Sequence, residues 1–107
     1  MAEFDISGRM SVKTLRNHFK NTFGLDLRVY KGKQFADESA TLASISDKKV
    51  EEFSCKANMQ VGNFEARFKE ATGITVQVAV LPDAPKEPGA LVNNTYTLGE
   101  ASRLFKG

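Results

Sequence analysis

The sequence has few of the residues that carry metal binding, catalysis or disulfide bonds. Among its 107 residues there is one cysteine, Cys55, one histidine, His18, and no tryptophan. One cysteine cannot form an internal disulfide, and one cysteine with one histidine cannot complete a zinc site. We therefore expect no metal and no cofactor, and a reducing compartment, the cytoplasm, is the expected location.

Long apolar runs and catalytic motifs are absent too. No stretch approaches the roughly 18 apolar residues that a membrane-spanning helix needs, and the acidic start, residues 1–5, lacks the pattern of a signal peptide. The sequence contains no glycine-rich phosphate loop, no nucleophile elbow and no zinc-protease motif. The formal charge of +2 is too small to indicate nucleic acid by itself. We therefore expect a protein that is not an enzyme and does not bind membranes.

The sequence contains an internal repeat instead. Self-similarity over this length indicates a repeated supersecondary unit. We expect one domain, residues 1–107, made of two repeats at about 4–45 and 53–105. The matching pairs include Phe4/Phe53, Phe19/Phe68 and Gly24/Gly73, a shift of 49 positions, and, after seven extra residues in the second copy, Thr41/Thr97 and Leu42/Leu98.

Each copy reads as a β-α-β unit. Alternation of apolar and polar residues predicts strands at 4–8 and 53–57 and again at 25–30 and 74–81. Between them, apolar residues at i, i+3 and i+7 predict an amphipathic helix. Ser11 is the expected N-cap of the first helix, and Gly24 and Gly73 are the expected left-handed residues that end the two helices. The apolar residues of the helices are Val12, Leu15 and Phe19, then Val61, Phe64 and Phe68.

Two such units in tandem predict an α+β fold of the order βαββαβ. This is the ferredoxin-like split βαβ arrangement, a four-stranded antiparallel sheet in the order 4-1-3-2 with both helices on one face. Thr97 and Glu100 form the spacing of a capping box, which predicts an additional C-terminal helix.

Part of the first copy, residues 12–42, resembles a ubiquitin-type β-grasp. A β-grasp-like fold is therefore the alternative, and this resemblance implies no function. The pattern also resembles a group of small uncharacterised bacterial proteins, which implies a bacterial origin and no activity. The residues of the β-grasp resemblance are Val12-Lys13, Gly24-Leu25, Leu27-Arg28-Val29, Gly32-Lys33, Phe35, Asp37 and Thr41-Leu42; the second resemblance adds Phe19, Phe23, Tyr30 and Ala40 to Ala43.

A basic stripe runs through the first copy. Lys13, Arg16 and Lys20 share one flank of the predicted helix. The second copy has Gly62, Glu65 and Lys69 at these positions, so the fold does not require the stripe. It is either a solvated face or a surface for an acidic protein or nucleic acid. Between positions 9 and 33 the cations are Arg9, Lys13, Arg16, Lys20, Arg28, Lys31 and Lys33, against the single acid Asp26.

The predicted strand 74–81 carries no charge and would lie at an edge of the sheet. Such an edge needs a cover, because unpaired backbone groups beside apolar side chains recruit other strands. The cover is Leu91-Val92 or the C-terminal helix, a second copy of the chain, or the strand of a partner. The residues expected to face that partner are Thr75, Gln77, Ala79 and Leu81.

We expect Cys55 to be a buried, inert thiol and His18 to lie at the solvent edge of its helix. Among outward strand positions Tyr30 is the only aromatic residue, so a base-stacking sheet is not expected. The predicted function is that of a protein-binding or regulatory module that acts through the edge strand and the basic flank, with a protein partner or as a homodimer. The alternative is a weak, sequence-independent nucleic-acid binder that uses Arg9, Lys13, Arg16, Lys20, Arg28 and Lys31.

Overall fold

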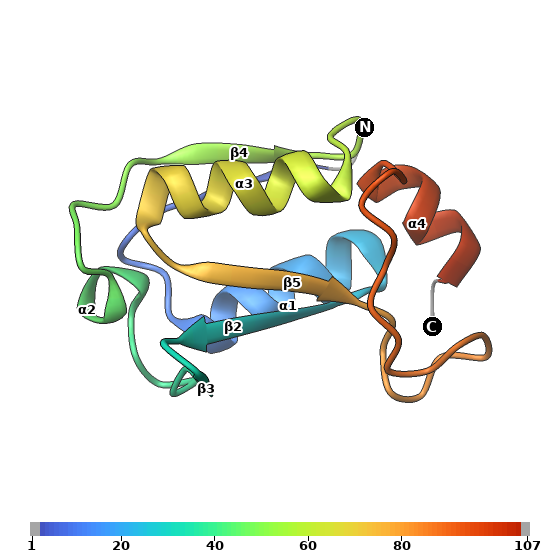
Figure 1. The fold of residues 1–107 in the computed structure, drawn as a ribbon, viewed down its shortest axis with the longest axis horizontal. Helices are drawn as coiled ribbons and strands as arrows, with labels where there is room; N and C mark the ends of the chain where they lie inside the picture. The colour runs from blue at the N-terminus through green and yellow to red at the C-terminus, as the bar shows by residue number, and fades with distance from the viewer. Residues whose placement is uncertain (1–2, 106–107) are drawn as a thin grey trace.

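A computed structural model describes residues 3–105. It is an α+β structure in which most helix and strand positions agree with the sequence pattern (Figure 1). Among residues 3–105, every helix is too short or too polar to cross a membrane. The elements in chain order are β1 (Glu3–Ile6), α1 (Val12–Phe23), β2 (Asp26–Lys31), β3 (Gln34–Phe35), α2 (Leu42–Ile45), β4 (Phe53–Lys56), α3 (Val61–Thr72), β5 (Thr75–Ala79) and α4 (Leu98–Phe105).

Residues 3–105 form two small antiparallel sheets in place of the single four-stranded sheet that we expected. The first strands of the two copies pair with each other, β1 with β4, as the expected strand order requires. The second strands do not flank this pair. They form their own sheet in the order β3-β2-β5, so the expected single layer with both helices on one face is not found.

The core explains why two sheets form. Phe19 and Phe23 of α1 and Phe64 and Phe68 of α3 are all fully buried, and the rings of Phe19 and Phe64 stack with centroids 5.6 Å apart. In Figure 1, α3 lies between β4 and β5, and α1 lies behind β5 and β2. Two separate strand pairs enclose these four large rings from two sides, which one sheet face cannot do, and close packing of such rings is a major source of stability.

In both sheets, the pairing register places one residue directly opposite its counterpart in the other half. In the first sheet Asp5 lies opposite Ser54, its match in the second copy, and the Ser54 hydroxyl donates to the Asp5 carboxylate at 2.6 Å. In the second sheet Arg28 lies opposite its own match, Gln77. Each pairing is therefore symmetric about a point where a residue meets its counterpart.

The segments before α2 and α4 have matching backbone hydrogen bonds. Each doubles back over the start of the long helix of its own half, and Thr41 and Thr97 form the corresponding β-bridges to Ser11 and Gln60. The matched N–H to C=O pairs are Val12 to Ala40 and Val61 to Tyr96, Leu42 to Met10 and Leu98 to Met59, and Ala43 to Gly8 and Gly99 to Ala57.

The predicted helix ends are confirmed. The Ser11 hydroxyl accepts from the Thr14 amide at 3.1 Å at the start of α1. Gly24 and Gly73 follow α1 and α3 with φ of 66° and 74°, the left-handed conformation that favours glycine. Thr97 and Glu100 form both hydrogen bonds of the capping box at the start of α4. The short strand β3, in contrast, was not expected.

Candidate binding cleft along helix α1

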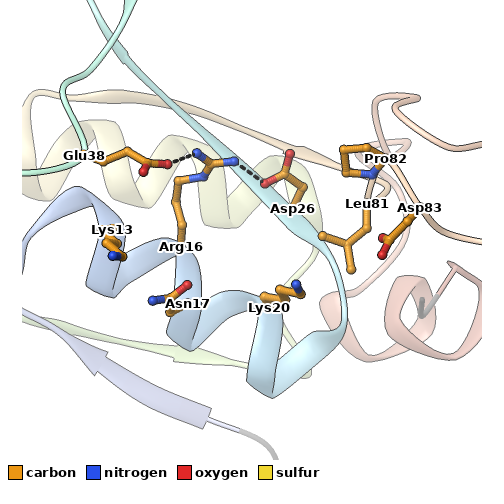
Figure 2. A pocket seen from close by; sticks show the side chains of 9 residues that line it. All are labelled: Lys13, Arg16, Asn17, Lys20, Asp26, Glu38, Leu81, Pro82 and Asp83. Carbon is orange, nitrogen blue, oxygen red and sulfur yellow. Dashed lines mark hydrogen bonds and ion pairs between the residues drawn. The ribbon is translucent and has the colours of Figure 1, made fainter.

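A cleft of about 390 Å³ lies between α1 and the segment that follows β5. It brings together four residues that the sequence analysis had placed on two separate surfaces: Lys13, Arg16 and Lys20 from the basic flank, and Leu81 from the predicted edge strand. Figure 2 shows the α1 residues along one wall and Leu81, Pro82 and Asp83 along the other. The remaining lining residues are Asn17, Asp26 and Glu38.

Arg16 is held in the middle of the cleft by two carboxylates. One guanidinium nitrogen donates to Asp26 at 2.9 Å, and the other donates to Glu38 (Figure 2). Burial disfavours the charged guanidinium, but the hydrogen bonds and charges of Asp26 and Glu38 outweigh this effect and raise the pKa of Arg16. Its positive charge is therefore taken up within the protein, the three side chains together carry one net negative charge, and Arg16 is a fixed part of the floor of the cleft.

Lys13 and Lys20 flank Arg16 and keep their charges available. Both are exposed, and no ion pair to either is formed within residues 3–105. Seven residues at a rise of 1.5 Å separate them by about 10 Å along the helix. Asn17 lies between them with an exposed amide. The rim of the cleft therefore offers two free ammonium groups with an amide between them.

The second half uses the matching positions differently. Glu65, the counterpart of Arg16, turns its carboxylate inward, where it accepts a hydrogen bond from the Val78 amide at 3.0 Å. Gly62, the counterpart of Lys13, lies against Asn94, and a Cβ atom there would stand 3.0 Å from the Asn94 Cβ. Only Lys69 keeps the cation of its counterpart, Lys20, and its ammonium group donates to the Gly73 carbonyl oxygen at 3.2 Å. The complete basic flank of three cations is thus found only in the first half.

The strand that we expected to be a free edge is largely covered. One side of β5 pairs with β2, and the other side meets residues 89–92, with hydrogen bonds from Val80 to Ala90 and from Val92 to Val78. Ala79 and Leu81 are buried, whereas Thr75 is exposed and Gln77 is half-buried. The segment around Leu91-Val92 is thus the cover, and only the start of β5 is left for a partner.

The other predicted anion contacts are not gathered in this cleft. Arg28 lies on the outer face of β2, where its guanidinium donates to the Gly89 carbonyl oxygen at 2.8 Å. Arg9 lines a separate pocket with Lys48 and Lys49, and Lys31 lines another with Lys69. The six cations proposed for nucleic acid therefore do not form one continuous stripe.

The sequence analysis missed an aromatic pair on the outer face of the second sheet. Phe35 of β3 lies opposite Tyr30 of β2, and the two rings stack with centroids 5.2 Å apart. Phe35 is 68% exposed. The expectation that Tyr30 is the only outward aromatic strand residue was wrong, because the sequence analysis predicted no strand at residues 34–35. The sequence signal that could have revealed β3 is Gly32, since glycine is favoured in the two-residue turn of a hairpin. In the structure Gly32 has a φ of 63°.

Cys55 is buried as expected, and burial raises the pKa of its thiol to about 12, so the reactive thiolate is suppressed. His18 is exposed and stacks on Phe4 with ring centroids 5.5 Å apart. Within the described part of the chain, histidine, cysteine and acidic side chains form no group of three or more that could hold a metal ion.

The cleft thus has the form of a small binding site, with fixed charges in its floor, free cations on one rim and an opposite wall of Leu81, Pro82 and the carboxylate of Asp83. Comparisons with protein-family models, with curated proteins and with solved structures found no match to the chain.

Proposed function

We propose that this chain is a non-enzymatic module that binds an acidic segment of another protein in the α1 cleft. The observation that carries the proposal is the pair of exposed lysines, Lys13 and Lys20, on either side of an arginine whose charge is already neutralised. Lys13 and Lys20 stand three and four residues from Arg16, the spacings at which like charges on a helix cost stability. The second half keeps a lysine at only one of the two positions, Lys69 for Lys20, and has Gly62 in place of Lys13, so the fold does not require the pair.

The lining favours a peptide over a nucleic-acid strand. Glu38 and Asp83 add carboxylates to the cleft, and Leu81 and Pro82 add apolar surface. A phosphate chain would meet these carboxylates with like charge, whereas a peptide can place acidic side chains at the lysines and apolar groups or amides elsewhere. The lysines suit two carboxylates about 10 Å apart, the length of two helical turns.

Binding of a short fluorescent peptide whose two glutamates are separated by neutral residues tests the proposal at low ionic strength. We expect the peptide to bind, and the double substitution Lys13→Gln/Lys20→Gln to weaken binding about tenfold, since each exposed charge pair contributes up to about 1 kcal/mol. The matched control is Lys49→Gln/Lys56→Gln, which removes two exposed positive charges outside the cleft. Equal losses in both variants would show attraction by net charge alone and contradict the proposal.

A single-stranded oligothymidine of equal charge serves as the competing ligand. Tighter binding of the oligothymidine than of the peptide, with a steep dependence on salt, would instead favour the nucleic-acid alternative.

A further inference from the structure

A second, smaller cavity of about 150 Å³ adjoins the cleft. Arg16 and Asp26 line both, so the cavity and the cleft lie on two sides of this ion pair. The cavity is otherwise lined by apolar side chains and by Arg28. The apolar residues are Val12 from α1, Val29 from β2, and Phe35 and Ala36 from the hairpin that follows β2.

The volume and the lining define what the cavity can hold. A cavity of roughly 150 Å³ with apolar walls is large enough for a benzene-sized group. It is far below the several hundred Å³ of a site for a complete small molecule. One apolar side chain, the size of leucine or phenylalanine, fits these limits.

Phe35 forms an exposed wall of this cavity and is held in place. A single exposed apolar residue is common on protein surfaces and indicates little by itself. Here, however, the Phe35 ring stacks on Tyr30, and the Tyr30 hydroxyl donates to the Gln77 side chain at 2.7 Å. A ring that is fixed before binding loses little conformational entropy on contact with a ligand.

We propose that this cavity takes one apolar side chain of the same acidic segment that the α1 cleft binds, an inference that rests on the proposed function. The segment passes over the Arg16–Asp26 pair, with carboxylates at Lys13 and Lys20 and its apolar side chain against Phe35. This arrangement is that of a protein interface, with a buried apolar anchor and charged groups at the rim. The partner is therefore an acidic peptide segment with one leucine- or phenylalanine-sized residue beside its acidic residues.

Two matched peptides test this proposal: the short peptide with two glutamates and a phenylalanine among the neutral residues between them, and the same peptide with alanine at that position. We expect the phenylalanine peptide to bind at least about fivefold tighter. Phe35→Ala should abolish the difference in affinity between the two peptides. The matched control is Leu91→Ala, since Leu91 occupies the position of Phe35 in the second half and is 54% exposed.

The outcomes separate the two proposals. Equal affinities for both peptides, each weakened by Lys13→Gln/Lys20→Gln, would contradict the anchor and leave the proposed function standing. Failure of both peptides to bind at low ionic strength would contradict both. A single-stranded oligothymidine could also displace the phenylalanine peptide. If the binding of the oligothymidine is lost in Phe35→Ala, the aromatic pair stacks nucleic-acid bases, and the peptide anchor is overturned. Circular dichroism of each variant confirms that the fold is retained.

Discussion

At the scale of single residues, Arg16 shows how a difference at one matching position gives the two halves different surfaces. In the second half Glu65 lies at the matching position, and its carboxylate accepts a hydrogen bond from the Val78 amide of β5. In the first half Arg16 binds Asp26 and Glu38 and leaves Lys13 and Lys20 at the rim. The same helix position is therefore structural in one half and, in our proposal, the floor of a binding site in the other.

Arg16→Ala should destabilise the protein by about 1–3 kcal/mol. The Asp26 side chain is only 14% exposed, and the substitution leaves its carboxylate without its arginine partner. Lys13→Ala is the control on the same helix and should change the free energy of unfolding by less than about 0.5 kcal/mol. Urea unfolding of the three proteins measures both effects, and similar stabilities for all three would show that the Arg16–Asp26 pair contributes nothing.

Glu65 gives the protein a pH dependence. Burial raises the pKa of Glu65 above its ordinary value of 4.5, and the hydrogen bond from Val78 only partly opposes this. Between the unfolded and the folded pKa the folded protein binds more protons than the unfolded chain, so the contribution of Glu65 to stability decreases as the pH rises through this window. Glu65→Gln keeps an acceptor for Val78 and removes the ionisation.

We therefore expect Glu65→Gln to gain stability relative to the unsubstituted protein as the pH rises from below 4.5 to neutrality. Unfolding by urea at several pH values measures the difference. A difference that is constant over this range would contradict the raised pKa.

At the scale of elements, the two long helices differ in their first turn. Ser11 caps α1 with its hydroxyl. In the described chain no side-chain hydrogen bond caps α3, whose N-cap residue is Gln60 in the same extended conformation, with φ of −68° and ψ of 147°. The backbone at Gln60 is thus already suited to a serine cap.

Exchanging these residues should shift stability in opposite directions. Gln60→Ser should raise the free energy of unfolding by about 0.5–1 kcal/mol, and Ser11→Gln should lower it by about 1 kcal/mol. Thermal unfolding followed by circular dichroism compares the two single variants. Loss of stability in Gln60→Ser would mean that the present side-chain contacts of Gln60 with Thr95 and Asn63 outweigh a cap.

The elements were predictable from the sequence because their signals are local. Apolar spacing located α1 and α3, the Thr97 and Glu100 pair located the start of α4, and Gly24 and Gly73 marked two helix ends. Pairing between strands depends on contacts far apart in the chain, and no local pattern determines it. The alternating residues of β2 and β5 are compatible with the border strands of one sheet and equally with a sheet of their own, so the sequence could not decide.

The same limit applies to the candidate site. The basic flank was visible because Lys13, Arg16 and Lys20 repeat at helical spacing. Arg16 forms ion pairs with Asp26 and Glu38, which lie 10 and 22 positions away in the chain. The position of Leu81 opposite α1 depends on the path of the chain after β5. Those contacts, and the cavity beside Phe35, follow from tertiary structure alone.

At the scale of the whole molecule, each sheet is made by both halves. Strands β1 and β2 of the first half pair with β4 and β5 of the second half. A common origin of the two halves and the β-grasp resemblance stay predictions. The pairing nevertheless has a consequence for folding, since neither half can complete its sheets alone.

Separate chains of residues 1–49 and 50–107 should therefore be unfolded alone and fold when mixed in equal amounts. Two copies of the first half cannot replace this pairing, because Asp5 would face Asp5 and Arg28 would face Arg28, and like charges directly opposite each other destabilise a sheet. Circular dichroism and sedimentation of the single and mixed chains measure this. A folded homodimer of residues 1–49 would contradict the requirement for both halves.

The central claim is that the α1 cleft binds an acidic segment, and NMR titration of the labelled protein with the two-glutamate peptide tests it most directly. We expect the changes in amide chemical shift to concentrate at residues 13–20 and at Leu81 and Asp83, which belong to the two walls of the cleft. They should need about tenfold more peptide in Lys13→Gln/Lys20→Gln and be unchanged in Lys49→Gln/Lys56→Gln. Changes that concentrate at the start of β5, around Thr75 and Gln77, with the cleft unaffected, would contradict the account.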